Sequence, residues 1–396
     1  MTALALLSAR LVGGLAQTVS FLLLARFVSP SEFGAIASLV GVATFGVAIA
    51  DLGVGTLLIR ERASNKESPL IRPILRVNAL GMTALAIVLC VLFAVFFSGQ
   101  LTATVGLLLI GWTLLERNSE TWLALAIADA RNRLTIALII LRRVLPLGVM
   151  GIFLLLTEGE GADIWFAAGQ AVGGLVGVVL ARTALGRTLP AVSSRVVGSG
   201  VLSRALPYWI AVGSAQVREL EVGTVQLVSS VQSAADFAIA SRILKPAQLI
   251  ASSVAQATLA KLSRPGVDNR TVRRSALALL ILAGSGSAVG VAIGALAPAI
   301  VQLTVGEGYD DAVSVLQVGL VGVSAAALSS PMASLLQARG AARTVATTSV
   351  IFAVLGLVSA VTGTLLAGPT GAMTGVSVAY ALKFLVLATC AFRLRV

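Results

Sequence analysis

Residues 79–97 read ALGMTALAIVLCVLFAVFF and contain no charged residue. A helix needs about 20 mostly apolar residues to cross the hydrocarbon core of a bilayer. Only helices and closed barrels satisfy their whole backbone in lipid, and a barrel strand shows short alternating segments instead of a long apolar run. This stretch therefore predicts a transmembrane helix.

The rest of the chain follows the same pattern. Its 396 residues are 57% hydrophobic and 12% charged, with a mean hydropathy of +0.98, whereas a soluble domain is about 25% charged. We predict an all-α polytopic membrane protein of about 12 spans, joined by loops too short to hold a separate domain. The expected spans are 6–28, 33–59, 77–97, 101–127, 134–156, 164–185, 206–230, 236–260, 276–303, 311–337, 344–367 and 371–392.

Lysine and arginine gather in every second loop and in the C-terminal tail. These cations are Arg60, Arg62, Lys66, Arg72, Arg76, Arg131, Arg133, Arg182, Arg187, Arg195, Arg204, Lys261, Arg264, Arg270, Arg273, Arg274, Arg339, Arg343, Arg393 and Arg395. The alternate loops carry acids instead, such as Glu32, Glu158 and Glu307. By the positive-inside rule both termini are cytoplasmic. The net charge of +12 then needs no nucleic-acid partner, and we expect a multi-pass protein of the inner or plasma membrane.

Two halves of six spans each show related motifs at a nearly constant offset. The matching pairs are 32–34 with 236–238, 76–80 with 273–277, and 130–131 with 338–339. Six spans restore the starting orientation, so this is a parallel repeat, which is typical of transporters. We predict one six-helix bundle over 1–190 and a second over 200–396. Glycine ladders in spans 6 and 9 (Gly169, Gly173, Gly177; Gly286, Gly290, Gly294) predict close helix packing.

Several enzyme classes lack their residues in this sequence. Glycine precedes none of the four lysines, so a Walker A loop is excluded, and the absence of histidine excludes His-based triads and imidazole metal sites. No GxSxG elbow is present. Outer acids such as Glu158, Glu160 and Asp163 suit a metal-dependent transferase, but they are better explained as the complement of the cytoplasmic cations. We predict no catalytic residue, no metal and no cofactor.

Charged residues inside the spans are the main functional signal, because each is costly if it faces lipid. Nine are cations: Arg10, Arg26, Arg117, Arg142, Arg143, Arg218, Arg242, Lys245 and Lys383. Five are acids: Asp51, Glu116, Glu120, Glu219 and Glu221. The balance of 9 − 5 = +4 favours an anionic passenger.

We predict that substrate binding falls to Arg26, Arg142, Arg218, Arg242 and Lys245. Arg242 and Lys245 share a face of span 8 beside Pro246, and two like charges do not neutralise each other. For the others a structural alternative stays open: Arg26 can snorkel to the interface, and Arg218 can pair with an acid three residues on.

The predicted ion-coupling residues are Asp51, Glu116 and Glu221. Asp51 is the best single acid for ion coupling, because it lies within the span, several residues before Arg60, the cation at the end of that span. Glu116 and Glu120 share a face at a spacing of four, and pairing with Arg117 or a neighbouring cation is the structural alternative.

Several segments resemble a known family. The stretches 24–34 (LARFVSPSEFG), 50–55 (ADLGVG) and 60–61 (RE) look like the opening of Wzx-type polysaccharide flippases of the multidrug/oligosaccharidyl-lipid/polysaccharide (MOP) exporter superfamily. Segments 221–223, 235–237, 308–309 and 335–340 are similar to its second half. The resemblance implies two six-helix bundles around a cationic cavity that flips a polyprenyl-diphosphate-linked glycan outward. Within it, Arg26, Asp51 and the region of Glu221 match family motifs.

The resemblance also implies membrane lipids as partners, together with a polysaccharide polymerase and glycosyltransferases. Two other functions stay open. A multidrug or ion antiporter of the same superfamily would need an acid-rich cavity for cationic drugs, and a membrane glycan polymerase or transferase would need a large outer loop.

Overall fold

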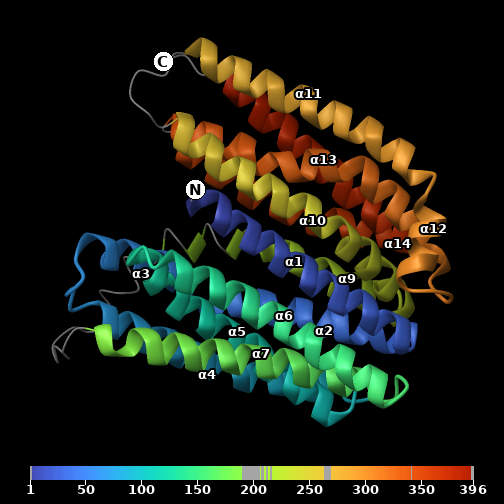
Figure 1. The fold of residues 1–396 in the computed structure, drawn as a ribbon. Helices are drawn as coiled ribbons and strands as arrows, with labels where there is room; N and C mark the ends of the chain where they lie inside the picture. The colour runs from blue at the N-terminus through green and yellow to red at the C-terminus, as the bar shows by residue number, and fades with distance from the viewer. Residues whose placement is uncertain are drawn as a thin grey trace. The chain divides into compact units, whose positions relative to one another are not determined.

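The computed structural model describes residues 2–189, 206, 209–210, 213–214, 216–262, 269–339 and 341–393. Over these ranges the chain is helical and contains no strand (Figure 1), which confirms the all-α prediction. The elements are α1 Thr2–Phe27, α2 Pro30–Ala50, α3 Val54–Ser64, α4 Ile71–Phe96, α5 Ala103–Ala128, α6 Asn132–Leu156, α7 Ala162–Leu185, η1 Gly186–Thr188, η2 Val217–Leu220, α9 Glu221–Val228, α10 Val231–Leu262, α11 Asn269–Gly294, α12 Ala297–Thr304, α13 Asp310–Ala338 and α14 Ala342–Arg393.

Eight helices in the described ranges are long and apolar enough to cross a membrane. One of them, α14, contains a break at Ala367 and Gly368, where Gly368 adopts a φ of 58°. It therefore provides both of the last two predicted spans, and the break lies where the sequence predicted a loop. Helix α5 is absent from the eight because three charged residues fall within residues 116–120.

Among the predicted spans that the structure describes in full, two are interrupted, which corrects the sequence prediction. Span 2 was expected to run unbroken over 33–59, but α2 ends at Ala50 and α3 begins at Val54. Leu52 (φ 52°) and Gly53 (φ 69°) adopt left-handed conformations that a continuous helix does not allow. Span 9 divides into α11 and α12, and Pro298 lies in the first turn of α12, where its missing N–H does no harm.

The chain forms two compact units. Unit 1 comprises Met1–Val28 and Ala35–Glu219, and unit 2 comprises Ser29–Gly34 and Leu220–Val396. The predicted division between residues 190 and 200 stays a prediction, because residues 190–205 lie outside the described ranges.

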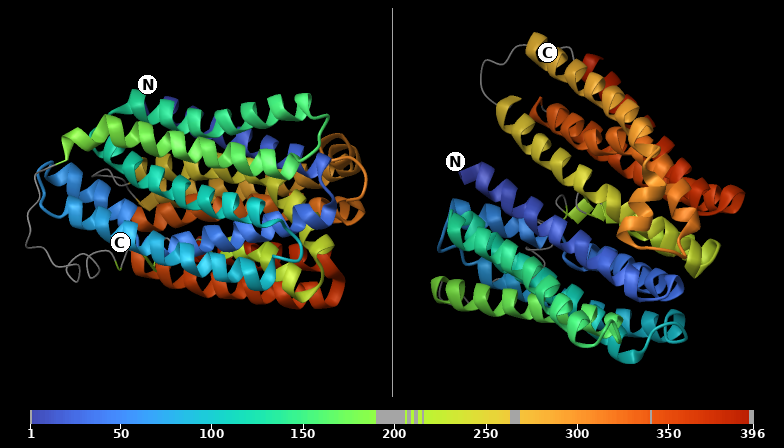
Figure 2. Two further views of the ribbon diagram at one scale, coloured as in Figure 1. Left: turned by 90° about the horizontal axis from the view of Figure 1, so that it is seen from below. Right: turned by 45° about the vertical axis from the view of Figure 1, so that its right-hand side comes forward.

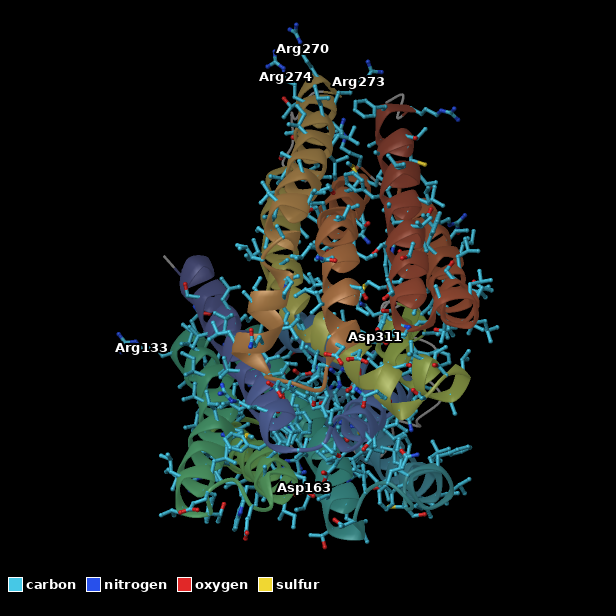
Figure 3. The ribbon with its side chains drawn as sticks, turned by 90° about the vertical axis from the view of Figure 1, so that its right-hand side faces the viewer. Arg133, Asp163, Arg270, Arg273, Arg274 and Asp311 are labelled. Carbon is cyan, nitrogen blue, oxygen red and sulfur yellow. The ribbon has the colours of Figure 1, made fainter. Side chains whose placement is uncertain are left out.

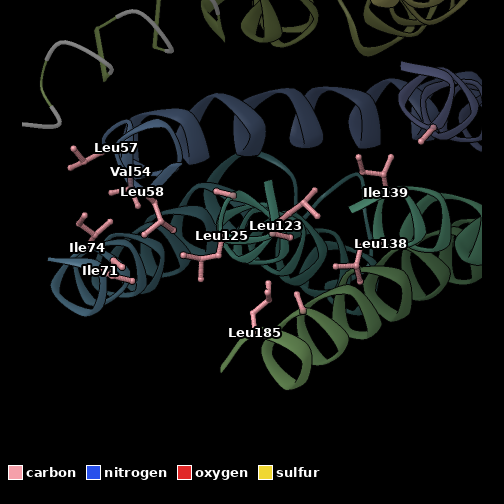
Figure 4. Close-up of a cluster of buried hydrophobic side chains, with 14 residues drawn as sticks. Val54, Leu57, Leu58, Ile71, Ile74, Leu123, Leu125, Leu138, Ile139 and Leu185 are labelled. Carbon is pink, nitrogen blue, oxygen red and sulfur yellow. The ribbon is translucent and has the colours of Figure 1, made fainter. Parts of the chain in front are cut away.

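Unit 1 is built on packing of α5 and α6 against α7, of α1 against α6, and of α3 against α5 (Figures 1 and 2). At one end, a cluster of buried aliphatic side chains joins α3, α4, α5, α6 and α7. Figure 4 labels ten of its 14 members: Val54, Leu57, Leu58, Ile71, Ile74, Leu123, Leu125, Leu138, Ile139 and Leu185. The cluster holds the short α3 helix against α5.

The glycine ladders are confirmed as packing faces. In unit 1, a Cβ at Gly173 would lie 2.9 Å from the carbonyl oxygen of Arg142, and one at Gly177 would lie 2.7 Å from Ser119 Oγ. In unit 2, a Cβ at Gly290 would collide with the carbonyl of Leu320 on α13. Absence of a side chain therefore sets how closely α7 approaches α5 and α6, and how closely α11 approaches α13.

Charge of one sign gathers at each end of the helices. In unit 2, Arg270, Arg273 and Arg274 project from the start of α11, whereas Asp311 lies at the start of α13, toward the other end of that unit (Figure 3). This is the separation that the positive-inside rule describes.

Candidate functional site: a charged network in unit 1

The break between α2 and α3 places a carboxylate inside unit 1. Asp51 is fully buried, and its carbonyl oxygen accepts a hydrogen bond from Val54 N at 2.9 Å in the first turn of α3. Arg117 on α5 meets this carboxylate with two nitrogens: Nε lies 2.8 Å from Oδ1, and Nη2 pairs with Oδ2. Asp51 therefore lies at the break of the helix, where its carboxylate meets Arg117 of α5.

Arg117 begins a chain of alternating charges. Its Nη1 lies 3.0 Å from Oε2 of Glu120, whose Oε1 lies 3.2 Å from Nη2 of Arg142 on α6. Arg142 Nη1 lies 3.1 Å from Oε1 of Glu116, and the same oxygen lies 2.7 Å from Nη2 of Arg143. We call these six residues, Asp51, Arg117, Glu120, Arg142, Glu116 and Arg143, the charged network.

The charged network is electrically neutral, with three carboxylates and three guanidinium groups. Burial of ionised groups in a membrane protein requires such pairing, because an unpaired charge costs several kcal/mol or more. The open alternative for Glu116 and Glu120, pairing with nearby cations, is therefore what the structure shows. Arg142 and Arg143, which the sequence places side by side, both contact Glu116.

The cationic excess lies outside the charged network. Removing its three cations and three acids from the nine and five intramembrane charges leaves 6 − 2 = +4. The remaining cations are Arg10, Arg26, Arg218, Arg242, Lys245 and Lys383, and the remaining acids are Glu219 and Glu221.

The predicted substrate-binding residues are distributed over both units. In unit 1, Arg142 is 7% exposed within the charged network, and Arg218 is half-buried in η2. Arg26 is exposed in the last turn of α1, and no ion pair involves it among the described residues. In unit 2, Arg242 and Lys245 are both half-buried on α10, which continues through Pro246 without a break.

Glu221, the third predicted ion-coupling residue, begins α9 in unit 2 and is 6% exposed. Its Oε1 accepts a hydrogen bond of 3.0 Å from the Tyr380 hydroxyl on α14. Sequence reasoning missed Tyr380, because 159 residues separate the two and no local spacing connects them. For Arg117 and Glu120 the sequence indicated only a structural pairing, which the structure shows, and it assigned neither to binding or coupling.

A second ion pair lies outside the spans, in unit 1. Arg62 at the end of α3 forms a bidentate pair with Asp129 in the turn after α5, with both distances at 2.9 Å. Arg62 Nη1 also donates to the carbonyl oxygens of Lys66 (2.7 Å) and Thr188 (3.1 Å). Both side chains of the pair are 5% exposed. Hydrogen bonding by Arg62 lowers the pKa of Asp129, and burial opposes that shift. Arg62 thus acts structurally here, besides contributing to the loop charge.

The chain resembles a known protein family and several membrane transporters of known structure. The family model described as "Polysaccharide biosynthesis protein" matches residues 2–259. An inward-facing multidrug resistance MATE family transporter of the MOP superfamily shares 14% identity and a TM-score of 0.75, covering 98% of this chain and 97% of that one. The lipid II flippase MurJ in an inward closed conformation shares 16% identity and a TM-score of 0.74, covering 98% and 87%. The MATE transporter VcmN of Vibrio cholerae, in a mutant form, shares 16% identity and a TM-score of 0.66, covering 99% and 95%. No curated protein sequence matches the chain.

At 14–16% identity these structures show the fold, and with the long apolar helices they make the chain a multi-pass membrane protein. The chain belongs to the polysaccharide biosynthesis protein family, since the match spans more than half of its length. The family match confirms that the chain is a polysaccharide biosynthesis protein, as the resemblance seen in the sequence implied.

Proposed function

We propose that this protein flips a polyprenyl-diphosphate-linked oligosaccharide from the cytoplasmic to the outer leaflet for cell-surface polysaccharide synthesis. The observation that carries the proposal is the intramembrane excess of +4, all of it outside the neutral charged network. A diphosphate is the anionic part of such a substrate, and guanidinium and ammonium groups are its natural ligands. Membership of the family and the fold shared with MurJ support this substrate class.

In this account Arg26, Arg142, Arg218, Arg242 and Lys245 bind the substrate. Alternating access needs an energy source, and the sequence holds no Walker A loop. Moving one charge across 100 mV supplies about 2.3 kcal/mol, so an anion moving outward across an inside-negative membrane gains in the required direction. Asp51, Glu116 and Glu221 are the proposed coupling groups, each pairing with a cation or a hydroxyl in one state only.

The proposal includes the orientation and the partners. Both termini lie in the cytoplasm, as the cation-rich loops require. Glycosyltransferases supply the lipid-linked substrate on that side, and a polysaccharide polymerase uses it on the other side.

A multidrug antiporter is the second candidate, because the fold is shared with MATE transporters. A cavity for cationic drugs would need an excess of acid, and six of the eight intramembrane charges outside the network are cations. The charge balance therefore favours the glycan carrier.

The test uses cells in which the chromosomal gene is deleted and replaced by variants. Arg242→Ala with Lys245→Ala should abolish surface polysaccharide and cause its lipid-linked precursor to accumulate, at normal protein levels in the membrane. The control is Arg270→Ala, an exposed cation at the start of α11, which should leave export unchanged. Normal export by the double variant, or drug sensitivity with normal polysaccharide in the deletion strain, would overturn the proposal.

A further inference from the structure

Glu120 contacts two arginines of the charged network. It is the acid that bridges two arginines through different oxygens, Oε2 to Arg117 at 3.0 Å and Oε1 to Arg142 at 3.2 Å. Each of these arginines also has a second carboxylate partner, Asp51 for Arg117 and Glu116 for Arg142. If Glu120 moved away, neither arginine would be left as an unpaired buried charge.

Glu120 is also the most accessible member of the network. Its side chain is 38% exposed, compared with 0% for Asp51 and 13% for Glu116. Asn118 and Trp122 lie on the half-exposed stripe of α5 that continues from Leu107. Successive residues of an α-helix are about 100° apart, so Glu120 points away from this stripe and toward the protein side of the helix. Glu120 at 38% and Arg117 at 20% are the two most exposed side chains of the charged network.

Arg142 carries donors that the network does not satisfy. Its Nε and Nη1 have no hydrogen-bond partner in the described structure, although the side chain is only 7% exposed. Nη1 lies within ion-pair distance of Glu116, and both oxygens of Glu116 also lack a hydrogen bond, so the contact between Arg142 and Glu116 is an ion pair without hydrogen-bond geometry. Buried donors nearly always have an acceptor, and Arg142 therefore has donors available for a further anion.

We propose that Glu120 is an internal stand-in for the substrate's phosphate groups, and that a diphosphate displaces it to bind Arg117 and Arg142. A diphosphate presents more oxygens than a carboxylate and suits the forked donors of two guanidinium groups. The exchange explains how Arg142 binds an anion although it is paired at rest. That the diphosphate belongs to a lipid-linked glycan rests on the proposed function. The displacement of Glu120 by a diphosphate does not rest on it.

The test measures binding of inorganic diphosphate to the purified full-length protein by isothermal titration calorimetry. Glu120→Gln keeps the shape of the side chain but removes its charge, so it should compete less and raise diphosphate affinity about tenfold, the factor for roughly one charged hydrogen bond. Glu160→Gln is the control: it removes the same charge at an exposed position in the loop after α6, outside the charged network. Its affinity should change by less than about threefold.

Two further variants keep the test decisive if Glu120→Gln does not fold. Glu120→Asp retains the charge but shortens the reach to both arginines, so its affinity should lie between those of the wild type and Glu120→Gln. Arg117→Lys retains the charge but loses the forked donors, and should weaken binding. Equal tightening in Glu160→Gln and Glu120→Gln would reduce the effect to net charge and overturn the exchange. An absence of tightening at Glu120, or an absence of diphosphate binding in every variant, would also overturn it.

Different results would refute the proposed function and the displacement of Glu120. Unchanged diphosphate binding in Glu120→Gln, together with normal glycan export by the wild type, would refute the exchange and leave the proposed function standing. Tightened binding in Glu120→Gln, with no export of lipid-linked glycan by the wild type, would support the anion site and refute the proposed substrate.

Discussion

Removal of Arg117 should strongly destabilise unit 1, and the structure gives the size of the effect. Asp51 is 0% exposed and takes both of its charged contacts from Arg117. Arg117→Gln leaves this carboxylate buried and unpaired, which costs about 3–5 kcal/mol. Asp51→Asn leaves Arg117 paired with Glu120 and partly exposed at 20%, so the expected cost is only about 1–3 kcal/mol.

The double variant separates a specific pair from simple loss of packing. With neither charge present no unpaired ion remains, so Arg117→Gln with Asp51→Asn should be more stable than the sum of the single effects by about 2 kcal/mol. Reversible unfolding in mixed lipid and detergent micelles, followed by circular dichroism, measures all three variants. Glu160→Gln, an exposed change in the loop between α6 and α7, is the control and should have little effect. Additive single effects would show that Asp51 and Arg117 are not coupled and would refute the assignment of the network.

Three other predictions follow from the described contacts. Arg62 lowers the pKa of Asp129. The stability from this pair is therefore fully present above the pKa of the unfolded state, about 3.9, and is lost as the pH falls through the lower pKa of the folded state. The stability of Asp129→Asn, measured by unfolding at decreasing pH, should lack this pH-dependent loss. Gly290→Leu should force α11 away from α13 and destabilise the protein by about 1–3 kcal/mol or more, as measured by thermal unfolding in detergent; an unchanged melting temperature would contradict the close packing. A membrane-impermeant thiol reagent added outside cells in which both native cysteines are replaced should label Glu158→Cys and not Arg187→Cys, and the reverse result would invert the orientation.

The apolar runs predicted the helices well, because lipid exposure leaves little choice of residue along a span. In α4, for example, Leu80, Ile87, Val91 and Val95 are 52% or more exposed on one face, as a lipid-facing stripe requires. The final break was also predictable, since Gly368 and Pro369 interrupt an otherwise apolar stretch.

The interruption after Ala50 was not predicted, because hydropathy averages over a window and Asp51 with Gly53 hardly lowers it. Local backbone conformation decides that break, through positive φ at Leu52 and Gly53. The glycine ladder was visible in the sequence, but not which helices it would bring together.

The charged network shows the same limit at the level of the site. The spacing of Glu116 and Glu120 on α5 indicated a shared face, and pairing was recognised as one alternative. The partners came from elsewhere: Asp51 lies 66 residues from Arg117, and Arg142 lies 22 residues from Glu120. Such contacts depend on how closely α5, α6 and α7 pack, so the sequence indicated which charges are buried but not how they are paired.

The most direct test of the central claim is outward flipping of a fluorescent polyprenyl-diphosphate-linked oligosaccharide in proteoliposomes, read by an impermeant quencher. Transport is compared with the ion gradient and membrane potential intact, with both collapsed by ionophores, and with both collapsed and ATP added inside. We predict flipping only in the first condition, at a rate reduced by Arg242→Ala with Lys245→Ala and unaffected by Arg270→Ala. Activity restored by ATP alone, or absence of flipping in the presence of a full gradient, would contradict the account.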